Sequence, residues 1–363
     1  MLRWLDGFDF TSTAGNLQSG TIAYHYAYNN SFLQGNSLAG RYGGRCLNVF
    51  NTAFDEFILS KTFESRSTWT VGFDLTWTTT CIPNVSFLVF YDSTVSKANA
   101  QVGLRFTTSG CLELVRGPLT APTIIATGST IFLGGSNWKY VELQVTFANS
   151  GGLYELRIDD QLELSGTADT QNTSNASANI IALRWEAFGT SGVSWDNYYI
   201  ADTTGVINNS FLGPLRVDTY WPAADDAVDF TPYSGSNYQM VDDKNHGDFG
   251  TLDTDYNSTN TTGDIDTFTV DSIGNNGPIL GVAETVWCNR QAGQSVGIQP
   301  LMKVGGVEYT GSTYYPVPKT STGLGETTTQ VQATQMIKET NPNTGGSWTP
   351  SDANSVKYGY KAI

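Results

Sequence analysis

The stretch TWTVGFDLTW, residues 68–77, decides the fold class of this chain. Its large apolar side chains stand at every second position: Trp69, Val71, Phe73, Leu75 and Trp77. This period of two is typical of a β-strand with one face in a core and the other in water. The same alternation recurs at residues 140–147 (YVELQVTF) and 153–159 (LYELRID). We therefore predict a protein built from β-strands.

Short turn signals separate these strands. Residues 148–152 (ANSGG) and 159–161 (DDQ) break the alternation and place three strands in two successive hairpins. Along the chain there are about a dozen such strands without a convincing helix between them, which favours an antiparallel sandwich. The predicted fold class is all-β: an antiparallel jelly-roll β-sandwich followed by a second, smaller β-rich domain.

A change of character at residues 204–214 (TGVINNSFLGP) predicts a domain boundary. Turn residues cluster there, and a proline closes the stretch. We assign residues 1–205 to the jelly-roll sandwich and residues 206–363 to a β-rich domain for attachment and assembly. Residues 357–363 (KYGYKAI) are expected to form the last strand.

Two apolar segments of the second domain lack a clear polar face, namely residues 278–287 (PILGVAETVW) and 328–337 (TTQVQATQMI). One interpretation is that they make contact surfaces for other chains, since soluble monomers seldom expose such patches. The alternative is that both are central strands of an ordinary core. Further on, Thr349 as N-cap and Pro350 at the first helical position predict one short helix.

Composition and charge exclude several classes of protein. The chain has 363 residues, of which 15% are charged, and its net charge is −15. Such an acidic surface repels a phosphate backbone, so we expect no nucleic-acid partner. No apolar run approaches the ~20 residues that span a membrane, and no secretion signal is visible. Cys46, Cys81, Cys111 and Cys288 are too scattered for a zinc site, and free thiols fit synthesis in a reducing cytoplasm.

No catalytic apparatus is visible in the sequence. Glu155 and Asp159 share a strand face, but Arg157 stands between them, so an ion pair on a solvated face is favoured over a catalytic carboxylate pair. The glycine-rich residues 40–46 (GRYGGRC) lack the ending of a phosphate-binding loop and predict a turn with two solvated arginines. Two isolated histidines offer no nucleophile or metal motif. We predict that the protein is not an enzyme.

Tyr24, Tyr26 and Tyr28 occupy alternate positions of one predicted strand, in the stretch AYHYAYNN. A row of tyrosines can contact a carbohydrate or a protein partner, because each ring has an apolar face and a polar tip. The alternative is a half-buried strand, in which tyrosine is also common. Both interpretations stay open at this point.

Residues 253–264 (DTDYNSTNTTGD) resemble a calcium loop in part. Asp253, Asp255 and Asn257 stand at positions 1, 3 and 5, and Asp264 stands at position 12. An EF-hand loop requires a glycine at position 6 and a glutamate at position 12, and this stretch has neither. Side chains of this kind also form turns through bonds to their own backbone. We interpret the stretch as a connector first and a calcium site second, and we expect no other cofactor.

Several longer stretches resemble one family. Residues 138–170, followed by SWDNYYIAD at 194–202, are similar to the closing half of laminin-G-like (concanavalin-like) jelly-roll domains of bacteriophage structural proteins. Later stretches, among them NNSFLGPLRVDTYWP at 208–222, resemble the second part of the same proteins, so the likeness extends along essentially the whole chain. The resemblance implies a virion component and carries over no catalytic residue.

We therefore expect a structural component of a tailed-phage virion, made in the host cytoplasm. It would belong to a tail fibre, tail tip or collar, or decorate the capsid, and would mediate assembly and adhesion to the host surface. The expected partners are other virion proteins, further copies of the chain and a host surface glycan, without membrane insertion. The alternatives are a lectin-like, carbohydrate-binding receptor module and, behind it, a glycan depolymerase.

Overall fold

The computed structural model describes residues 1–9, 26–28, 39–50, 56–77, 83–132, 134–135, 137–186, 192–242, 255–274, 277–291, 293–316, 320–321, 327–328 and 332–363. These residues divide into two compact units, the first ending at Val217 and the second beginning at Asp218. Within the described ranges, no helix is long and apolar enough to cross a membrane. The protein is nearly all β, as predicted.

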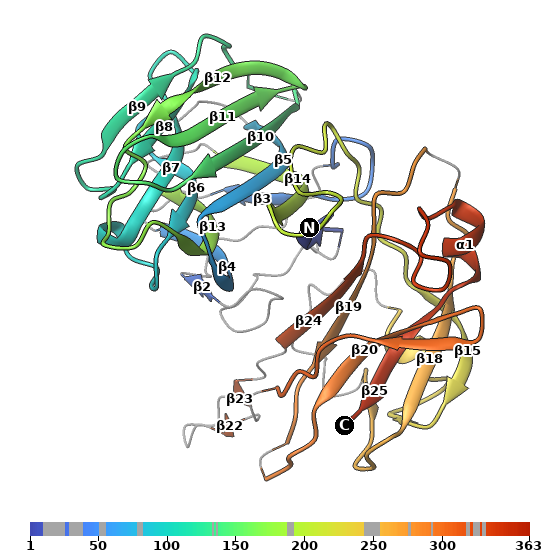
Figure 1. Cartoon of the computed structure of the whole chain (residues 1–363). Helices are drawn as coiled ribbons and strands as arrows, with labels where there is room; N and C mark the ends of the chain where they lie inside the picture. Colours follow the sequence, from blue (N-terminus) through green and yellow to red (C-terminus); the bar gives the residue numbers. More distant parts are fainter. Residues whose placement is uncertain are drawn as a thin grey trace. The chain divides into compact units, whose positions relative to one another are not determined.

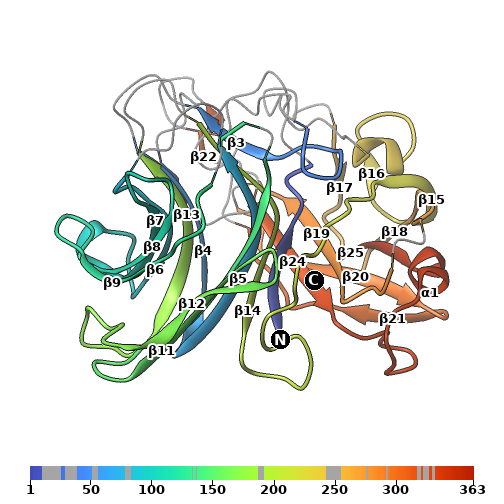
Figure 2. The same ribbon diagram turned by 90° about the horizontal axis from the view of Figure 1, so that it is seen from above.

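The first unit contains two antiparallel sheets that face each other (Figures 1 and 2). The order of strands in the first sheet is β1 (Leu2–Asp6), β14 (Gly192–Asp202), β5 (Thr68–Trp77), β10 (Lys139–Thr146), β11 (Gly152–Ile158) and β12 (Gln161–Ala168), with β3 (Leu47–Phe50) also paired to β14. The order in the second sheet is β2 (Tyr26–Tyr28), β4 (Glu56–Arg66), β13 (Ala178–Glu186), β6 (Ser86–Tyr91), β7 (Ala100–Phe106), β8 (Leu112–Arg116) and β9 (Thr123–Thr127). A short 3₁₀ turn, η1 (Lys97–Asn99), precedes β7. This arrangement confirms the predicted jelly-roll β-sandwich.

The core of the sandwich lies between the two sheets. The apolar residues of β5 are buried, and their rings contact rings from the second sheet. The centroids of Phe73 and Phe87 are 6.2 Å apart, and those of Trp77 and Phe106 are 4.7 Å apart. Burying a side chain of this size contributes roughly 1.5–3 kcal/mol. The alternation at residues 68–77 therefore identified the inner face of the first sheet correctly.

The predicted hairpins of β10, β11 and β12 are present, with a register shift between Leu156 and Arg157 in the second one. Asp159 and Asp160 form the turn between β11 and β12, and both have a positive φ, of 49° and 65°. Such a two-residue turn matches the twist of the strands that it joins. Because Glu142 of β10 lies opposite Arg157 of β11, their side chains share the outer face of the first sheet.

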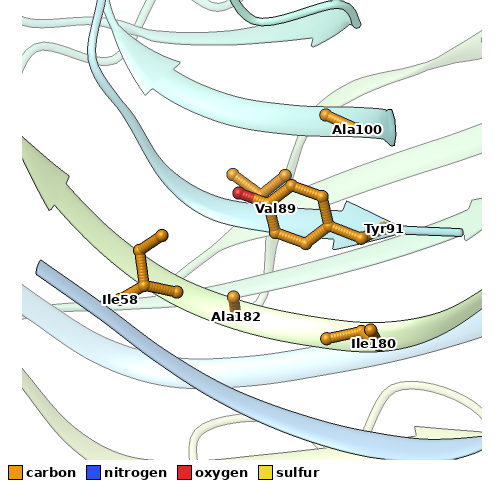
Figure 3. Close-up of a cluster of buried hydrophobic side chains, with 6 residues drawn as sticks. All are labelled: Ile58, Val89, Tyr91, Ala100, Ile180 and Ala182. Atoms are coloured by element: carbon orange, nitrogen blue, oxygen red, sulfur yellow. The ribbon is translucent and has the colours of Figure 1, made fainter. Parts of the chain in front are cut away.

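The outer face of the second sheet carries its own apolar cluster (Figure 3). Val89 and Tyr91 alternate with Phe90, whose ring faces the core. The cluster comprises Ile58, Val89, Tyr91, Ala100, Ile180 and Ala182, all buried. Val95 and Leu119, from connecting loops, pack against it. This part of the second sheet is therefore covered by the unit itself, whereas the first sheet has polar side chains on its outer face.

The second unit is built on a five-stranded sheet. Its order is β15 (Pro222–Val228), β18 (Ile265–Val270), β25 (Lys357–Ala362), β20 (Ile298–Val304) and β21 (Val307–Thr310). The remaining pairs are β19 (Val282–Cys288) with β24 (Gln332–Lys338), β16 (Thr231–Pro232) with β17 (Asn257–Ser258), and β22 (Thr320–Ser321) with β23 (Thr327–Thr328). A 3₁₀ turn, η2 (Tyr238–Met240), lies between β16 and β17 in the chain. The last strand, β25, is where the sequence predicted it.

The helix predicted at Thr349 is also present, as α1 (Pro350–Ser355). The Thr349 hydroxyl accepts a bond from the backbone nitrogen of Asp352, and the Asp352 carboxylate accepts one from the backbone of Thr349. This reciprocal capping box satisfies two N–H groups that would otherwise lack partners. The predicted N-terminus of the helix is confirmed at the level of single residues.

The two apolar segments of the second domain form β19 and β24, which pair with each other. Val286 of β19 and Met336 of β24 are buried and belong to apolar clusters of the second unit. Their large side chains therefore serve the core of this unit, which favours the second of the two interpretations given for them. Of the cysteines that the structure describes, Cys46, Cys111 and Cys288 are free thiols, as predicted.

Candidate functional site

A tight turn at residues 39–45 is attached to the outer face of the first sheet. The backbone nitrogen of Gly43 donates to the oxygen of Gly40 at 3.3 Å. Gly43 and Gly44 have φ values of 96° and 70°, a region that glycine enters without strain. The turn predicted from the glycines is confirmed. The expectation that both its arginines are solvated is wrong for Arg41, which has a buried partner.

Arg41 is anchored on two buried carboxylates. Its Nη1 donates to Oδ1 of Asp74, and its backbone nitrogen donates to Oδ2 of Asp196 at 2.8 Å. Asp74 and Asp196 lie opposite each other on β5 and β14, and they are 0% and 4% exposed. Asn197 donates from Nδ2 to the second oxygen of Asp74 at 2.7 Å. The turn is therefore fixed to the sheet by side chains that water does not reach.

Burial changes the acidity of both carboxyl groups. It raises the pKa of Asp74 to about 6, against the opposing effects of the bonds from Arg41 and Asn197. It raises the pKa of Asp196 to about 7, although two backbone N–H groups donate to that carboxylate. A charged group that leaves water loses solvation, which favours its neutral form. The charge beneath the turn therefore changes within the neutral pH range.

Above these carboxylates, four partly exposed side chains gather around Tyr42, which is 43% exposed. The guanidinium carbons of Arg41 and Arg216 lie 5.3 and 5.9 Å from the centre of the Tyr42 ring. Lys139 donates to Oδ2 of Asp159 at 2.7 Å, and Nη2 of Arg41 lies 3.8 Å from Oδ1 of the same carboxylate. We call Arg41, Tyr42, Lys139, Asp159 and Arg216 the Tyr42 surface.

The segment before the end of the first unit fixes one side of the Tyr42 surface. Oε1 of Glu142 accepts a bond from the backbone nitrogen of Leu212 at 2.9 Å. Oδ1 of Asn197 accepts a bond from the backbone nitrogen of Val217 at 2.7 Å. These bonds hold residues 212–217 on the outer face of the first sheet and so position Arg216. The predicted boundary at residue 205 differs, since the first unit continues to Val217.

The Tyr42 surface can bind a ligand through non-covalent contacts. The tyrosine offers a ring, the arginines and the lysine offer N–H donors, and the aspartate offers an acceptor. Such a combination suits a hydroxyl-rich ring, whose apolar face can contact the tyrosine while its hydroxyls bond to the rim. Asp74 and Asp196 are closed off below Arg41, so they support the rim and do not face a ligand.

Two of the three tyrosines predicted as a contact surface lie at the edge of the second sheet. Tyr26 and Tyr28 belong to β2, where they are opposite Ser60 and Ile58 of β4. Tyr24 lies outside the described residues. The contact assigned to these residues stays a prediction.

Two residues of the proposed calcium loop bond to other side chains in the structure. Nδ2 of Asn257 donates to the hydroxyl of Tyr360 at 2.8 Å, and Asp264 accepts a bond from a threonine of its own turn. Asp255 is half-buried, and Asp253 lies outside the described residues. Among the residues that the structure describes, no three His, Cys, Asp or Glu side chains are grouped to hold a metal ion. The calcium site stays a prediction.

Arg157 pairs with only one of the two acids weighed as catalytic residues. Nε of Arg157 donates to Oε1 of Glu155 at 2.7 Å, and the ion pair runs along β11. Asp159 pairs with Lys139 and belongs to the Tyr42 surface. Sequence reasoning did not single out Arg41 and Tyr42 as candidate binding residues. The available signal was Asp74, a carboxylate at the centre of a strongly alternating strand, which needs a cation from elsewhere in the chain.

Comparison with known proteins gives structural likeness alone. No protein-family model matches the chain, and no curated protein matches it. Among solved structures, the alginate lyase Aly36B is 10% identical with a TM-score of 0.35, over 53% of this chain and 95% of that chain. The carbohydrate-binding module CBM66 from Bacillus subtilis is 13% identical with a TM-score of 0.32, over 50% of this chain and 96% of that one.

A phage protein is also among the similar structures. The conserved carbohydrate esterase from the Shiga toxin-encoding bacteriophage phi24B is 14% identical with a TM-score of 0.34. The likeness covers 47% of this chain and 87% of the esterase. These neighbours are glycan-active or carbohydrate-binding proteins, and at such low identity the likeness concerns the fold alone.

Proposed function

We propose that this protein is an adhesion component of a tailed-phage virion, in a tail fibre, tail tip or collar or on the capsid, and that it binds a host surface glycan through the Tyr42 surface. The observation that carries the glycan-binding part is the exposed Tyr42 ring, surrounded by hydrogen-bonding side chains that are fixed from below. The virion part is supported by the family resemblance of the sequence.

Fixed geometry favours binding at this place. Arg41 cannot move without breaking its bonds to Asp74 and Asp196, and Lys139 and Asp159 hold each other. A surface that is ordered before the ligand arrives loses less conformational entropy on binding. Each contact is weak by itself, so we expect modest affinity for one site and stronger binding when many copies act together.

A glycan array of host envelope polysaccharides, probed with the full chain, tests the proposal. For a glycan that binds, Tyr42→Ala should weaken binding at least about tenfold, because it removes the ring at the centre of the contact. Tyr42→Phe should retain most of the affinity, because the ring face remains. Leu162→Ala is the matched control, since Leu162 is 61% exposed on β12 of the same unit. Unchanged binding by Tyr42→Ala, or no glycan bound at all, would contradict the proposal.

We propose binding without turnover. Among the described residues, the acids nearest to the Tyr42 surface are either buried beneath Arg41 or paired with a cation, so this part of the chain offers no free carboxylate pair there to act as acid and nucleophile. Incubation with the bound polysaccharide should therefore release no reducing sugar. Release that is abolished by Asp159→Asn would instead indicate a depolymerase.

A second role, attachment to other virion chains, is supported by exposed side chains of the second unit. Its large exposed residues are Val228, Tyr233, Tyr256, Leu280, Val307 and Tyr315. We propose that the predicted attachment domain, residues 206–363, holds most of the contacts to neighbouring chains and to further copies of this chain. A virion map in which this unit touches no other chain would contradict the assignment.

A further inference from the structure

Two tyrosines of the second unit form an exposed aromatic pair. Tyr233 is 52% exposed and Tyr256 is 41% exposed, and the centres of their rings are 5.5 Å apart at an angle of 53°. The backbone nitrogen of Tyr233 donates to the oxygen of Tyr256 at 2.9 Å, next to the pairing of β16 with β17. The rings are therefore held together by the backbone, and both remain in contact with water.

The stretch that resembled a calcium loop contains one of these rings. Asn257, the neighbour of Tyr256, donates to the hydroxyl of Tyr360 and to the backbone oxygen of Asn237. These bonds fix the start of the loop on the core of the unit and direct the chain so that Tyr256 meets Tyr233. The polar residues of the loop thus act as structural supports for an exposed ring.

The surroundings of the pair are acidic. Residues 218–363 contain 17 of the 34 acidic residues of the chain and only 7 of its 19 basic residues. The strand β15, which precedes β16 in the chain, carries exposed Asp225 and is followed by exposed Asp229. Oδ1 of Asp225 accepts a bond from the backbone nitrogen of Tyr238, in the 3₁₀ turn that follows Tyr233. The acidic strand is therefore bonded to the segment that follows the first tyrosine of the pair.

We propose that this pair binds a lysine or arginine side chain on an extended, basic segment of a partner protein. The face of a tyrosine ring attracts a cation, by ~0.5–1 kcal/mol at an exposed site. The nearby aspartates add attraction for a positive segment, whereas they repel an anionic glycan. This inference deepens the proposed attachment role of the second unit, and it is independent of the Tyr42 surface.

Titration of the full chain with a hexa-arginine peptide, followed by NMR or calorimetry, tests the proposal. Because any basic peptide is attracted to an acidic protein, the ring variants decide the outcome. Tyr233→Ala together with Tyr256→Ala should weaken binding at least about fivefold, which corresponds to the loss of two cation–π contacts. Tyr233→Phe together with Tyr256→Phe should bind like the unsubstituted chain, because the ring faces remain. Tyr315→Ala is the matched control, as Tyr315 is 58% exposed in the same unit.

Two results would overturn the proposal. The first is equal affinity for hexa-arginine in the double alanine variant, which would show that charge alone attracts the peptide. The second is that the unsubstituted chain binds a neutral oligosaccharide, such as maltohexaose, and that the double alanine variant loses this binding but still binds hexa-arginine. Both measurements use the isolated protein. A negative result would therefore contradict only the binding of a basic segment by this tyrosine pair, and the attachment role of the second unit would still be tested by the virion map.

Discussion

Replacing Arg41 by methionine should destabilise the first unit in a manner that depends on pH. The change keeps most of the aliphatic stem but leaves the carboxylate of Asp74, which is 0% exposed, without its cation. Removing one partner of a buried ion pair costs roughly 3–5 kcal/mol. The Arg41 side chain is itself 23% exposed, so water can replace part of the interaction and the lower end, about 3 kcal/mol, is expected.

The loss should be largest above neutral pH. Burial already raises the pKa of Asp74 to about 6, and without Arg41 this pKa should rise further. Near pH 5 the buried carboxyl group is then protonated and needs no cation, so most of the loss disappears. At about pH 8 the unsubstituted protein holds the charged pair, which the variant cannot form, and the resulting loss of ~3 kcal/mol lowers the melting temperature of a unit of this size by roughly 6–12 °C.

Thermal unfolding followed by circular dichroism at both pH values measures the effect. Arg157→Met is the matched control, because Arg157 forms a partly exposed pair with Glu155 that should contribute below about 1 kcal/mol. An equal loss for Arg41→Met at both pH values, or a loss no greater than that of the control, would refute the assignment of Arg41 as the counter-ion of buried Asp74.

Three further expectations concern the unsubstituted fold and two single positions. The folded-state pKa values of Asp74 and Asp196 lie above the ordinary value of 3.8. The contribution of these two groups to stability is therefore fully present below about pH 4 and is lost as the pH rises through about 7. The urea concentration at the unfolding midpoint should fall over this pH window, and it should fall less in Asp196→Asn. Gly72→Ala places a Cβ only 2.1 Å from the Tyr199 ring, so it should lower the free energy of unfolding by about 3 kcal/mol in the same assay. A loss below about 1 kcal/mol would show that the ring can move. Thr349→Ala removes the cap of α1 and should lower the stability of the second unit by about 1 kcal/mol, with Thr349→Ser close to neutral.

The parts of the fold that local sequence specifies could be predicted. The alternation at residues 68–77 identified the buried face of β5 because strand side chains alternate with a period of two. Thr349 and Pro350 identified the start of α1 because a cap is a contact within one turn of chain. In each case the signal and the structure that it specifies lie within a few residues of each other.

The candidate site could not be predicted, because its residues come together only through the sheet. Asp74 and Asp196 face each other across the register of β5 and β14, and Arg41 reaches them from a third segment. No local pattern encodes which strands are neighbours. The polar pattern at residues 253–264 includes one residue with a structural role. Asn257 supports the exposed ring of Tyr256 through its hydrogen bonds to the core of the second unit.

The attachment of residues 212–217 to the first sheet has a mechanical consequence. Side-chain oxygens of Glu142 and Asn197 accept hydrogen bonds from the backbone of this segment. The segment lies between the second unit and the end of β14 in the chain. A pulling force applied from the second unit therefore acts on these hydrogen bonds before it acts on β14. Because β14 lies inside its sheet, its separation requires breaking its pairing with β1, β3 and β5. Resistance to pulling is governed by the rate of unfolding. That rate should rise when the hydrogen bonds to residues 212–217 are removed. We expect the Glu142→Ala and Asn197→Ala variants to yield at lower force than the unsubstituted protein when it is stretched between its two ends.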